Sequence, residues 1–429
     1  MTDSAQTHDG YARELVPDSA TGPGRRVFFI VAGSLCGLPV FLLSAQVTSG
    51  LPLPRAYLAM LTGGLLSGLL GGLSAYSGAR SRMTLALLAE LAFGRWGAQA
   101  VKLLIAAALI GWFGVIVSAC GGTASKALAA AAGVTVAPYV FSIPLTVAIA
   151  VVTLRGVQGL EKLGQVIVPL TAVLLALSIG LVLHRGGPAA AHVAGGLSFS
   201  AAVSAITGSY IVGIVIQPDY GRFVRRPAAA GLAAGLALGA AYPAILILSS
   251  IPPVALGKSD LITAMIALGV GAPALGILLL GAWIDASACL YSGSLSLTNQ
   301  FPRLHLAQVV IAAAVLGAIS ALAHAERHFL GFLEALGLIL PPLAAAQITR
   351  ALSTPRAGLT LEAIEGGPAL RLAPAGAVLA GVAVGVAESR GWISLSGLAT
   401  LDSVCVSGAL TGLAALLARR KAVSAAQAA

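Results

Sequence analysis

The chain has 429 residues, of which 58% are hydrophobic and 9% are charged, and its mean hydropathy is +0.95. Soluble domains carry about 25% charged residues, so this composition excludes a soluble protein and indicates a membrane protein. The net charge of +10 comes from arginines scattered beside apolar segments, which suits an anionic lipid leaflet better than a nucleic acid. We therefore expect the lipid bilayer as a partner and no nucleic acid.

About twelve apolar runs follow one another along the chain. Each is close to the roughly 20 residues that a helix needs to cross about 30 Å of hydrocarbon. The runs do not alternate in polarity, as the strands of a membrane β-barrel do, so the sequence predicts an all-α integral membrane protein. The runs lie at 27–48, 55–78, 100–122, 138–154, 164–184, 197–217, 228–252, 264–298, 306–323, 328–348, 370–387 and 396–418.

Basic residues predict the orientation of these runs, because cytoplasmic loops are enriched in Lys and Arg. With the N-terminus inside, 19 of the 25 basic residues fall on the inner side. We therefore expect a multi-pass protein of the inner (cytoplasmic) membrane with both termini in the cytoplasm. Residues 1–26 are polar and are expected to form a disordered cytoplasmic tail, and residues 419–429 a second cytoplasmic tail.

The polar connections between the runs are short, and the longest internal one spans residues 353–368. A catalytic domain therefore has no segment to occupy, and neither a Ser/His nor an Asp/Asp motif is found within the apolar runs. The sequence favours a transporter over an enzyme.

The first and sixth runs contain small residues and proline near their middles. Backbone groups without helical hydrogen bonds are tolerated at this depth only where they line a cavity. Interrupted helices in corresponding positions of two repeats are typical of transporters that bind substrate at the membrane midplane. The alternative is close helix packing through small residues. The residues are Gly33, Ser34, Gly37 and Pro39 in the first run, and Thr207, Gly208, Ser209 and Gly213 in the sixth.

Four local motifs, in this order and at these spacings, resemble those of the nucleobase:cation symporter-1 family and, within it, of cytosine permease and purine-cytosine permease-like transporters. The resemblance is collinear from Arg25 to about Arg420. The motifs are GWFGV at 111–115, PDYGRFVRR at 218–226, LYSGSLSLTN at 290–299 and LILPPLAAAQI at 338–348.

The resemblance implies a LeuT-type fold with two inverted repeats of five helices and two extra helices. The repeats would cover residues 27–184 and 197–348, and the extra helices residues 370–418. It also implies import of a planar nitrogen heterocycle by alternating access, coupled to Na⁺ or H⁺ and without an organic cofactor. Two other functions remain open: the same fold carrying an amino acid or another small amine, and a membrane sensor or scaffold that transports nothing.

Trp112 and Tyr210 match positions at which the resembled family stacks its substrate. A planar base needs flat apolar faces and a few hydrogen-bonding partners at its edge. Ser209, Ser34 and the freed backbone from Gly208 to Gly213 are candidates for that edge. The alternative is that the aromatic residues are ordinary core residues and the serines bind their own backbone.

Several departures from the family pattern make cytosine itself doubtful as the substrate. Leu109 stands where cytosine permeases carry glutamine, Val212 where they carry serine, and Ala286 and Ala288 at asparagine positions. Loss of polar partners changes which base edge a site accepts. We expect a less polar or differently substituted heterocycle, for instance one like hydroxymethylpyrimidine.

Asp285 lies within the eighth run, and an ionisable residue at such a depth is a functional candidate by default. Three roles compete: a sodium ligand, a proton carrier, or a partner for a cationic substrate nitrogen; a purely structural carboxyl is the alternative. In the implied fold, Na⁺ lies between the first and eighth helices, and oxygen ligands suit this hard cation. The candidate ligands are the backbone of Ala32, Gly33 and Leu35 with the side chains of Asp285 and Ser287; Na⁺ is the only metal expected.

Four residues are candidates for gating. Asp219 and Arg222 follow the sixth run, where they fit an inner gate or a solvated charge cluster. Glu334 and Pro341 lie in the tenth run, which carries the outer gate in folds of this kind, and proline permits bending there. Glu334 equally fits a position facing the outer vestibule.

Overall fold

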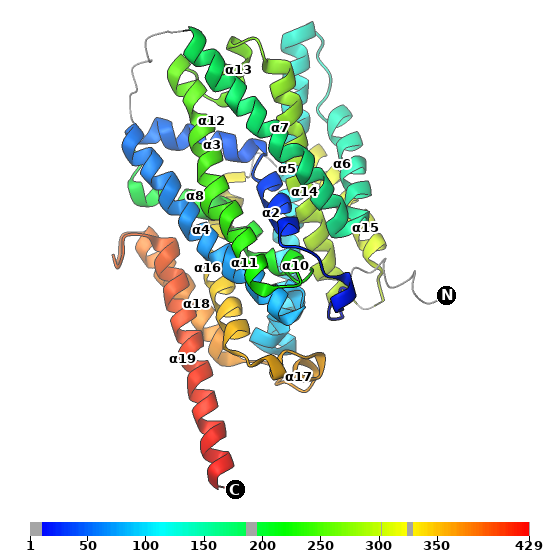
Figure 1. The fold of residues 1–429 in the computed structure, drawn as a ribbon, viewed down its shortest axis with the longest axis vertical. Coiled ribbons are helices and arrows are strands. Elements are labelled where there is room, and N and C mark those ends of the chain that lie inside the picture. The colour runs from blue at the N-terminus through cyan, green and yellow to red at the C-terminus, as the bar shows by residue number, and fades with distance from the viewer. Residues whose placement is uncertain (1–10, 186–194, 302, 324–328, 429) are drawn as a thin grey trace.

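The computed structural model describes residues 11–185, 195–301, 303–323 and 329–428, and Figure 1 shows them as a bundle of helices. Within these ranges the only extended pairing is a single bridge between Gly22 and Val224. The prediction of an all-α architecture is therefore confirmed.

The helices follow one another with short connections. In the described part of the chain, the 3₁₀- or π-helices are η1 (Asp18–Ala20), η2 (Ala237–Ala241) and η4 (Arg356–Gly358). The α-helices are α2 (Arg25–Ser34), α3 (Leu38–Gly50), α4 (Leu53–Ser81), α5 (Leu85–Ala132), α6 (Tyr139–Leu154), α7 (Gly156–Arg185), α8 (Phe199–Ser209), α9 (Ile211–Val215), α10 (Gln217–Gly221), α11 (Pro227–Leu236), α12 (Tyr242–Leu256), α13 (Leu261–Ala267), α14 (Gly271–Gln300), α15 (Leu306–Leu322), α16 (Phe329–Ser353), α17 (Leu361–Glu365), α18 (Leu372–Ser389) and α19 (Ala399–Ala428).

Each of the predicted apolar runs coincides with one helix or with two or three consecutive helices. Among the described residues, seven helices are long and apolar enough to cross a membrane, and the bent pair α2 and α3 adds an eighth. The other runs correspond to shorter or interrupted helices, such as α6, α15, and α8 with α9. The number of twelve spans therefore stays a prediction.

Both predicted interruptions are present. The axes of α2 and α3 differ by 63°, and in Figure 1 α3 runs across the direction of α2. Pro39 lies in the first turn of α3, two residues after the N-cap residue Gly37, which is in extended conformation. Proline costs no hydrogen bond at this position. In the sixth run, α8 ends at Ser209 and Tyr210 leaves the helical conformation before α9 begins.

Small residues also pack helices closely, as the alternative reading of the sequence expected. A methyl group on Gly68 of α4 would lie 2.6 Å from the Cα atom of Gly239, and one on Gly72 would lie 2.9 Å from the carbonyl oxygen of Gly231. Contacts this short require glycine, and they bring α4 against α11 and η2. Glycine therefore serves packing in α4 and a helix break in the first run.

The predicted third span, residues 100–122, forms part of the longer helix α5. A break at Gly94, where φ is +78°, separates a short first section from the membrane section. The backbone N–H of Trp96 there donates to the carbonyl of Ala369 (2.8 Å), and that of Arg371 donates to Phe93 (2.9 Å). These bonds fix the start of α5 against the segment before α18.

Residues 11–24, here called the N-terminal strap, differ from the disordered tail expected for residues 1–26. Asn299 Nδ2 donates to the carbonyl of Ala12 at 3.0 Å, and Arg13 donates to the carbonyls of Thr298 and Phe301 at the end of α14. These carbonyls lack partners within their own helix, so Arg13 satisfies them. Residues 1–10 lie outside the described part.

Further along, the strap is joined to the connections after α4 and α10. The N–H of Val16 donates to the carbonyl of Arg82 (3.2 Å), and that of Gly22 to the carbonyl of Phe223 (2.7 Å). Asp18 forms an ion pair with Arg82 at 3.1 Å. The strap therefore spans one end of the helical bundle.

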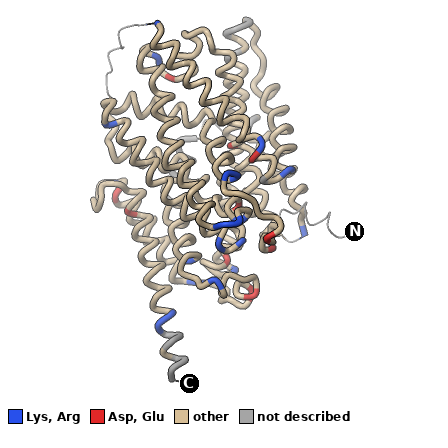
Figure 2. The backbone as a smooth tube through the Cα atoms, viewed as in Figure 1, with Lys and Arg blue, Asp and Glu red and all other residues tan. Residues whose placement is uncertain are grey.

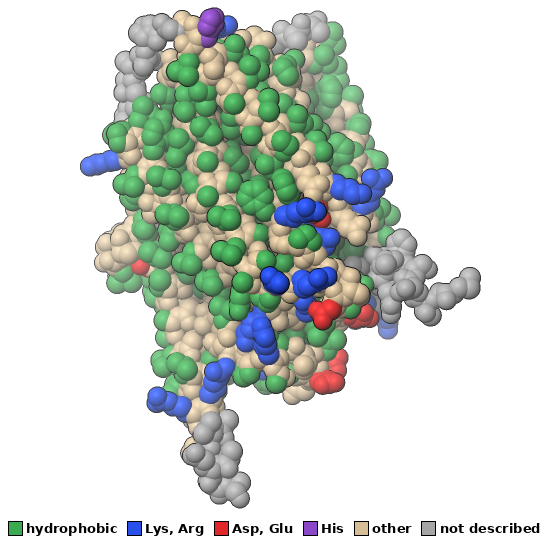
Figure 3. Space-filling model, viewed as in Figure 1, with side chains coloured by type: hydrophobic (Ala, Val, Ile, Leu, Met, Phe, Trp, Pro, Cys, Tyr) green, Lys and Arg blue, Asp and Glu red, His purple; other side chains and the backbone are tan. Residues whose placement is uncertain are grey.

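Basic residues gather toward this same end, here called the basic end, which includes Arg80, Arg82, Arg222 and Arg350. Figure 2 shows Lys and Arg around α10 and α17, while the flank of the bundle in Figure 3 is mostly hydrophobic. Leu65 and Leu69 on α4 expose 63% and 62% of their surface, as expected of residues facing lipid.

Candidate functional site

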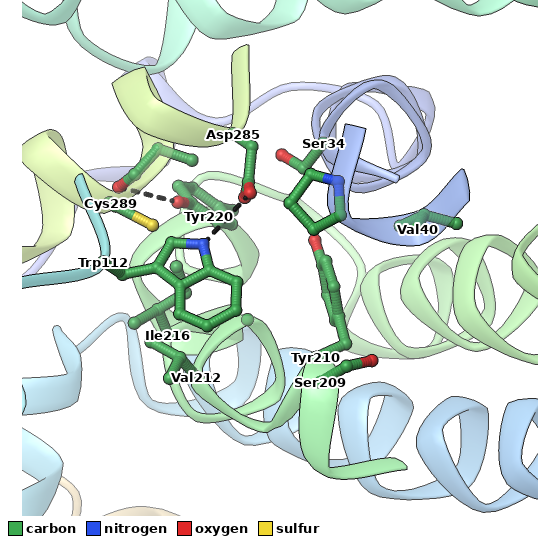
Figure 4. Close-up of a pocket in the computed structure, with 13 residues that line it drawn as sticks. Ser34, Val40, Trp112, Ser209, Tyr210, Val212, Ile216, Tyr220, Asp285 and Cys289 are labelled. Carbon is green, nitrogen blue, oxygen red and sulfur yellow. Dashed lines mark hydrogen bonds between the residues drawn. The ribbon is translucent and has the colours of Figure 1, made fainter. Parts of the chain in front are cut away.

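A pocket lies where the breaks in the first and sixth runs meet α5 and α14. Figure 4 shows its side chains converging from these elements. The pocket is a small cavity of about 30 Å³, so it must widen before a heterocyclic ring can enter. Its walls are formed by Ser34, Pro39, Val40, Trp112, Ser209, Tyr210, Val212, Gly213, Ile216, Tyr220, Asp285, Ala288 and Cys289.

The structure brings most of the predicted substrate-site residues together around this pocket, although they come from four separate parts of the chain. Gly208 is the exception, because it does not line the pocket and a methyl group there would meet no atom within 4 Å. Those that do line it are Ser34, Trp112, Ser209, Tyr210, Gly213 and Asp285.

Trp112 and Asp285 are joined across the pocket. The indole Nε1–H of Trp112 on α5 donates to Asp285 Oδ2 on α14 at 3.2 Å. Figure 4 shows the rings of Trp112 and Tyr210 on either side of the space into which the carboxylate points. The hydrogen bond fixes the orientation of both the indole ring and the carboxylate, so a flat face and an acceptor are presented together.

Tyr210 occupies the break between α8 and α9, and Gly213 makes room for its ring. A methyl group at Gly213 would lie 2.3 Å from Tyr210 Cε1, closer than any packed pair of carbon atoms. The ring of Tyr242 stands 6.1 Å away at a tilt of 44°. Gly213 therefore determines where the Tyr210 ring lies.

The pocket serines are already hydrogen-bonded within the protein. Ser34 Oγ donates to the carbonyl of Ile30 at 3.0 Å. Ser209 Oγ lies 3.0 Å from the carbonyl of Ile206 and 2.8 Å from Tyr242 Oη. Each serine lines the pocket and also binds its own helix, as the alternative reading expected.

Sequence reasoning placed Tyr220 only within a gating motif, yet it lines the pocket. Its hydroxyl donates to the carbonyl of Ala288 at 3.3 Å, and its ring stacks on Tyr291 with centroids 6.4 Å apart. Cys289 lies one turn after Asp285, so helical spacing alone places both on one face. No sequence signal pointed to Val40 or Ile216.

The departures from the family pattern divide into two groups. Val212 and Ala288 line the pocket, so apolar side chains replace polar ones at the site itself. Leu109 and Ala286 are fully buried and lie outside the pocket lining. Leu109 instead packs against Gly293 of α14.

The predicted cation ligands other than Asp285 do not line the pocket. Gly33 faces Ile284 and Gly164, and a methyl group on Gly33 would lie 2.6 Å from Ile284 Cδ1 and 3.0 Å from Gly164 Cα. Ala32, Leu35 and Ser287 are buried outside the pocket lining. The described residues hold no cluster of three His, Cys, Asp or Glu side chains suited to a metal ion.

Arg222 and Asp219 lie buried between the pocket and the strap. Arg222 donates to the carbonyl of Tyr11 at 2.7 Å, to the carbonyl of Asp219 at 3.2 Å and to Tyr291 Oη at 3.3 Å. Asp219 Oδ1 accepts from the N–H of Leu85 at 2.8 Å. The pair therefore ties together the strap, α10, α14 and the start of α5.

The two predicted outer-gate residues lie on α16. Pro341 is buried in the helix interior next to Pro342, whose carbonyl accepts from Ser407 Oγ of α19 at 2.7 Å. The two prolines lack N–H groups, so the carbonyls of Gly337 and Leu338 lose their helical donors and the helix can bend there. The side chain of Glu334 lies outside the described part of the structure.

The sequence was compared with those of known proteins. A sequence model of the family described as permeases for cytosine/purines, uracil, thiamine and allantoin matches residues 18–387. The chain belongs to this permease family. The cytosine permease of Escherichia coli K12 is 28% identical over 339 residues, which are 78% of this chain and 79% of that protein. The cytosine permease of E. coli O157:H7 has the same identity and coverage.

Solved transporter structures share the fold of this permease. Mhp1, a nucleobase-cation-symport-1 family transporter solved in a closed conformation with bromovinylhydantoin bound, has a TM-score of 0.78, 17% identity and 94% coverage of both chains. The inward-facing conformation of Mhp1 has a TM-score of 0.74 at 18% identity, covering 95% of this chain and 93% of that one. A Na⁺-coupled sialic acid symporter has a TM-score of 0.62 at 11% identity, covering 96% and 94%. The LeuT-type architecture is therefore confirmed, and the permease is a multi-pass membrane protein.

Proposed function

We propose that this permease is a secondary active symporter that imports a nucleobase-like planar nitrogen heterocycle by alternating access, coupled to Na⁺ or H⁺. The observation that carries the proposal is the pair of aromatic rings, Trp112 and Tyr210, flanking the carboxylate of Asp285 at two helix breaks. Aromatic faces stack on a heterocycle, while a few polar groups read its edge.

The substrate is a pyrimidine or purine less polar at its edge than cytosine, such as one like hydroxymethylpyrimidine. Val212 and Ala288 at the pocket wall support this, because an apolar wall accepts methyl or methylene substituents and leaves no unpaired polar group against them. The serines support it as well, since Ser34 and Ser209 are already engaged with carbonyls of their own helices.

In the proposed cycle, the two repeats, residues 27–184 and 197–348, move against each other around the pocket while residues 370–418 stay outside. Asp219 and Arg222 act as the inner gate, and Glu334 and Pro341 belong to the outer gate. The many bonds of Arg222 to the strap and to α14 support the first assignment, because they must break before the pocket opens toward the basic end.

The same proposal assigns the basic end and both termini to the cytoplasmic side of the inner membrane. For the ion, sodium bound by the backbone of Ala32, Gly33 and Leu35 with Ser287 competes with a proton carried by Asp285. Ser287 Oγ is buried without a hydrogen-bond partner among the described residues, which supports the sodium alternative.

Thermal stabilisation of the detergent-purified protein tests the proposal. Pyrimidines, purines, hydroxymethylpyrimidine, thiamine, amino acids and small amines are each added with sodium or choline at two pH values. A ligand at a hundredfold excess over its Kd stabilises the folded state by about 2.7 kcal/mol. A heterocycle should raise Tm, and either sodium or lower pH should enlarge the rise and identify the ion.

A second function, transport of a small amine, is favoured by one observation: the pocket holds a carboxylate and its lining contains no Lys, Arg or His. Stabilisation by amines or amino acids alone would replace the heterocycle with this cargo. Absence of stabilisation by every compound, together with absence of uptake into proteoliposomes, would favour a sensor or scaffold instead.

A further inference from the structure

Asp285 is the one acidic side chain among the residues that line the pocket. The hydroxyls of Ser34, Ser209 and Tyr220 each lie against a main-chain carbonyl at 3.3 Å or less. Asp285 accepts one hydrogen bond, from Trp112 to Oδ2, and Oδ1 accepts none from the described residues. An ionised carboxylate has about four acceptor positions and no donor, so Asp285 is the charged acceptor in the pocket lining.

The charge of this carboxylate is also uncompensated within the pocket. Its lining contains no basic side chain, and the salt bridges of the described residues all lie elsewhere. An unpaired charge in a poorly solvated site is costly. A ligand that brings a positive charge with its donors removes this cost on binding.

The surroundings of Asp285 limit the shape of such a ligand. The indole of Trp112 holds the carboxylate from one side, and Ala288 and Cys289 follow it on the same face of α14. The walls near the ring space are the aliphatic side chains Val40, Val212 and Ile216. The site therefore combines one charged acceptor with flat and apolar surfaces.

We propose that Asp285 selects aminopyrimidines bound as amidinium-like cations, in which an exocyclic amino group and the adjacent protonated ring nitrogen donate two parallel hydrogen bonds to the carboxylate. This inference rests on the proposed function and specifies which edge of the substrate binds to Asp285. Two parallel N–H donors match a carboxylate as the guanidinium of arginine does. A 4-oxo pyrimidine of the same shape places a carbonyl oxygen against Asp285, and the repulsion excludes it.

Two ligands that differ only in this edge test the proposal on the unaltered protein. They are 4-amino-2-methylpyrimidine and its 4-oxo counterpart, 2-methylpyrimidin-4-one, with Kd measured by Tm shift or calorimetry. The amino compound should bind at least tenfold more tightly. Equal binding of the two, or tighter binding of the oxo compound, would overturn the proposal while leaving heterocycle transport intact. Binding of aliphatic amines but neither pyrimidine would remove the proposed function as well.

The variant Asp285→Asn tests the residue. An amide presents one acceptor and one donor, so it pairs with the neutral aminopyrimidine and tolerates the oxo form. We expect the amino/oxo preference to fall at least tenfold. Asp260→Asn is the matched control, because Asp260 caps α13 far from the pocket lining and asparagine caps helices equally well. An unchanged preference in Asp285→Asn would overturn the role of Asp285.

The pH profile supplies a further readout. The other titratable side chains lining the pocket are Tyr210, Tyr220 and Cys289, and phenols and thiols ordinarily titrate above about pH 8. As the pH is lowered from 7.5 toward 5.5, affinity for the amino compound should rise while the ring gains its proton and Asp285 stays ionised, and this rise should disappear in Asp285→Asn. A flat profile in the unaltered protein would contradict binding as a cation.

Discussion

At the scale of single residues, the site depends on side chains that hold one another in place. Trp112 both offers its ring to the pocket and donates its indole N–H to Asp285, while Gly213 leaves the space that the Tyr210 ring fills. For each of these contacts, a single substitution can remove one interaction while the other interactions of the site stay in place.

Two substitutions of Trp112 separate its hydrogen bond from its ring. Trp112→Phe keeps a flat face but removes a hydrogen bond to a charged group, worth about 1.5–3 kcal/mol, so substrate affinity should fall about tenfold. Trp112→Leu also loses stacking, worth about 1–3 kcal/mol, and should cost about a hundredfold. Equilibrium binding of radiolabelled substrate measures both. Equal losses in the two variants would mean that the ring itself contributes nothing.

Alanine should lower Tm and substrate affinity at one of two glycines that lie five residues apart, and should be tolerated at the other. Gly213→Ala pushes its methyl group into the Tyr210 ring, and overpacking costs about 1–3 kcal/mol, so both Tm and substrate affinity should fall. Gly208→Ala is the matched control, since a methyl group there meets no atom within 4 Å and alanine favours a helix. Normal binding by Gly213→Ala would show that the position of Tyr210 is unimportant.

At the scale of elements, the N-terminal strap is held at the basic end by side chains from α14 and from the connection after α10. Arg222 donates a hydrogen bond to the carbonyl of Tyr11 in the strap, and Asn299 donates one to the carbonyl of Ala12. The anchoring Arg222 is fully buried, so its bonds form away from competing water.

Loss of the Arg222 side chain should therefore release the strap. In Arg222→Gln the shorter amide no longer spans from Tyr11 to Tyr291, and each buried polar group left unpaired costs about 1–3 kcal/mol. Hydrogen–deuterium exchange of residues 11–24 should speed up at least tenfold. Arg225→Gln is the control, since the Arg225 side chain is exposed. Equal exchange in the two variants would mean that the strap is held without Arg222.

At the scale of the whole molecule, the uneven placement of Lys and Arg predicts which end faces the cytoplasm. Ser259 lies on the connection between α12 and α13, and Ala357 lies in η4 next to the basic end; both are exposed. The exposed native thiol is Cys405, and the other three cysteines are buried. The variant Cys405→Ala therefore has no exposed native thiol that could react with the label.

In that background, a membrane-impermeant maleimide should label Ser259→Cys in intact cells. It should label Ala357→Cys only after the membrane is opened. The physical reason is that the anionic inner leaflet retains basic loops. The reverse pattern would invert the proposed orientation and, with it, the assignment of inner and outer gates.

Much of this architecture is local and therefore readable from the sequence. Crossing hydrocarbon demands long apolar stretches whatever lies beside them, so the apolar runs coincide with helices. Glycine and proline weaken a helix at their own positions, so the breaks near Gly37 and Tyr210 could be expected. The family resemblance predicted Trp112 and Tyr210 in the substrate site, and its ionisable side chain within an apolar run singled out Asp285.

Tertiary packing decided the rest. The sequence ranked Gly208 with Gly213, yet only Gly213 lies under an aromatic ring, because that depends on where Tyr210 turns. Residues 11–24 are polar and look disordered, but Arg13 and Arg222 supply bonds from elements hundreds of residues away. The sequence by itself determined where the chain crosses the membrane and breaks, since these follow from local hydrophobicity and backbone freedom. Only the tertiary structure decided which side chains meet in the pocket and what closes it, since both depend on contacts between distant helices.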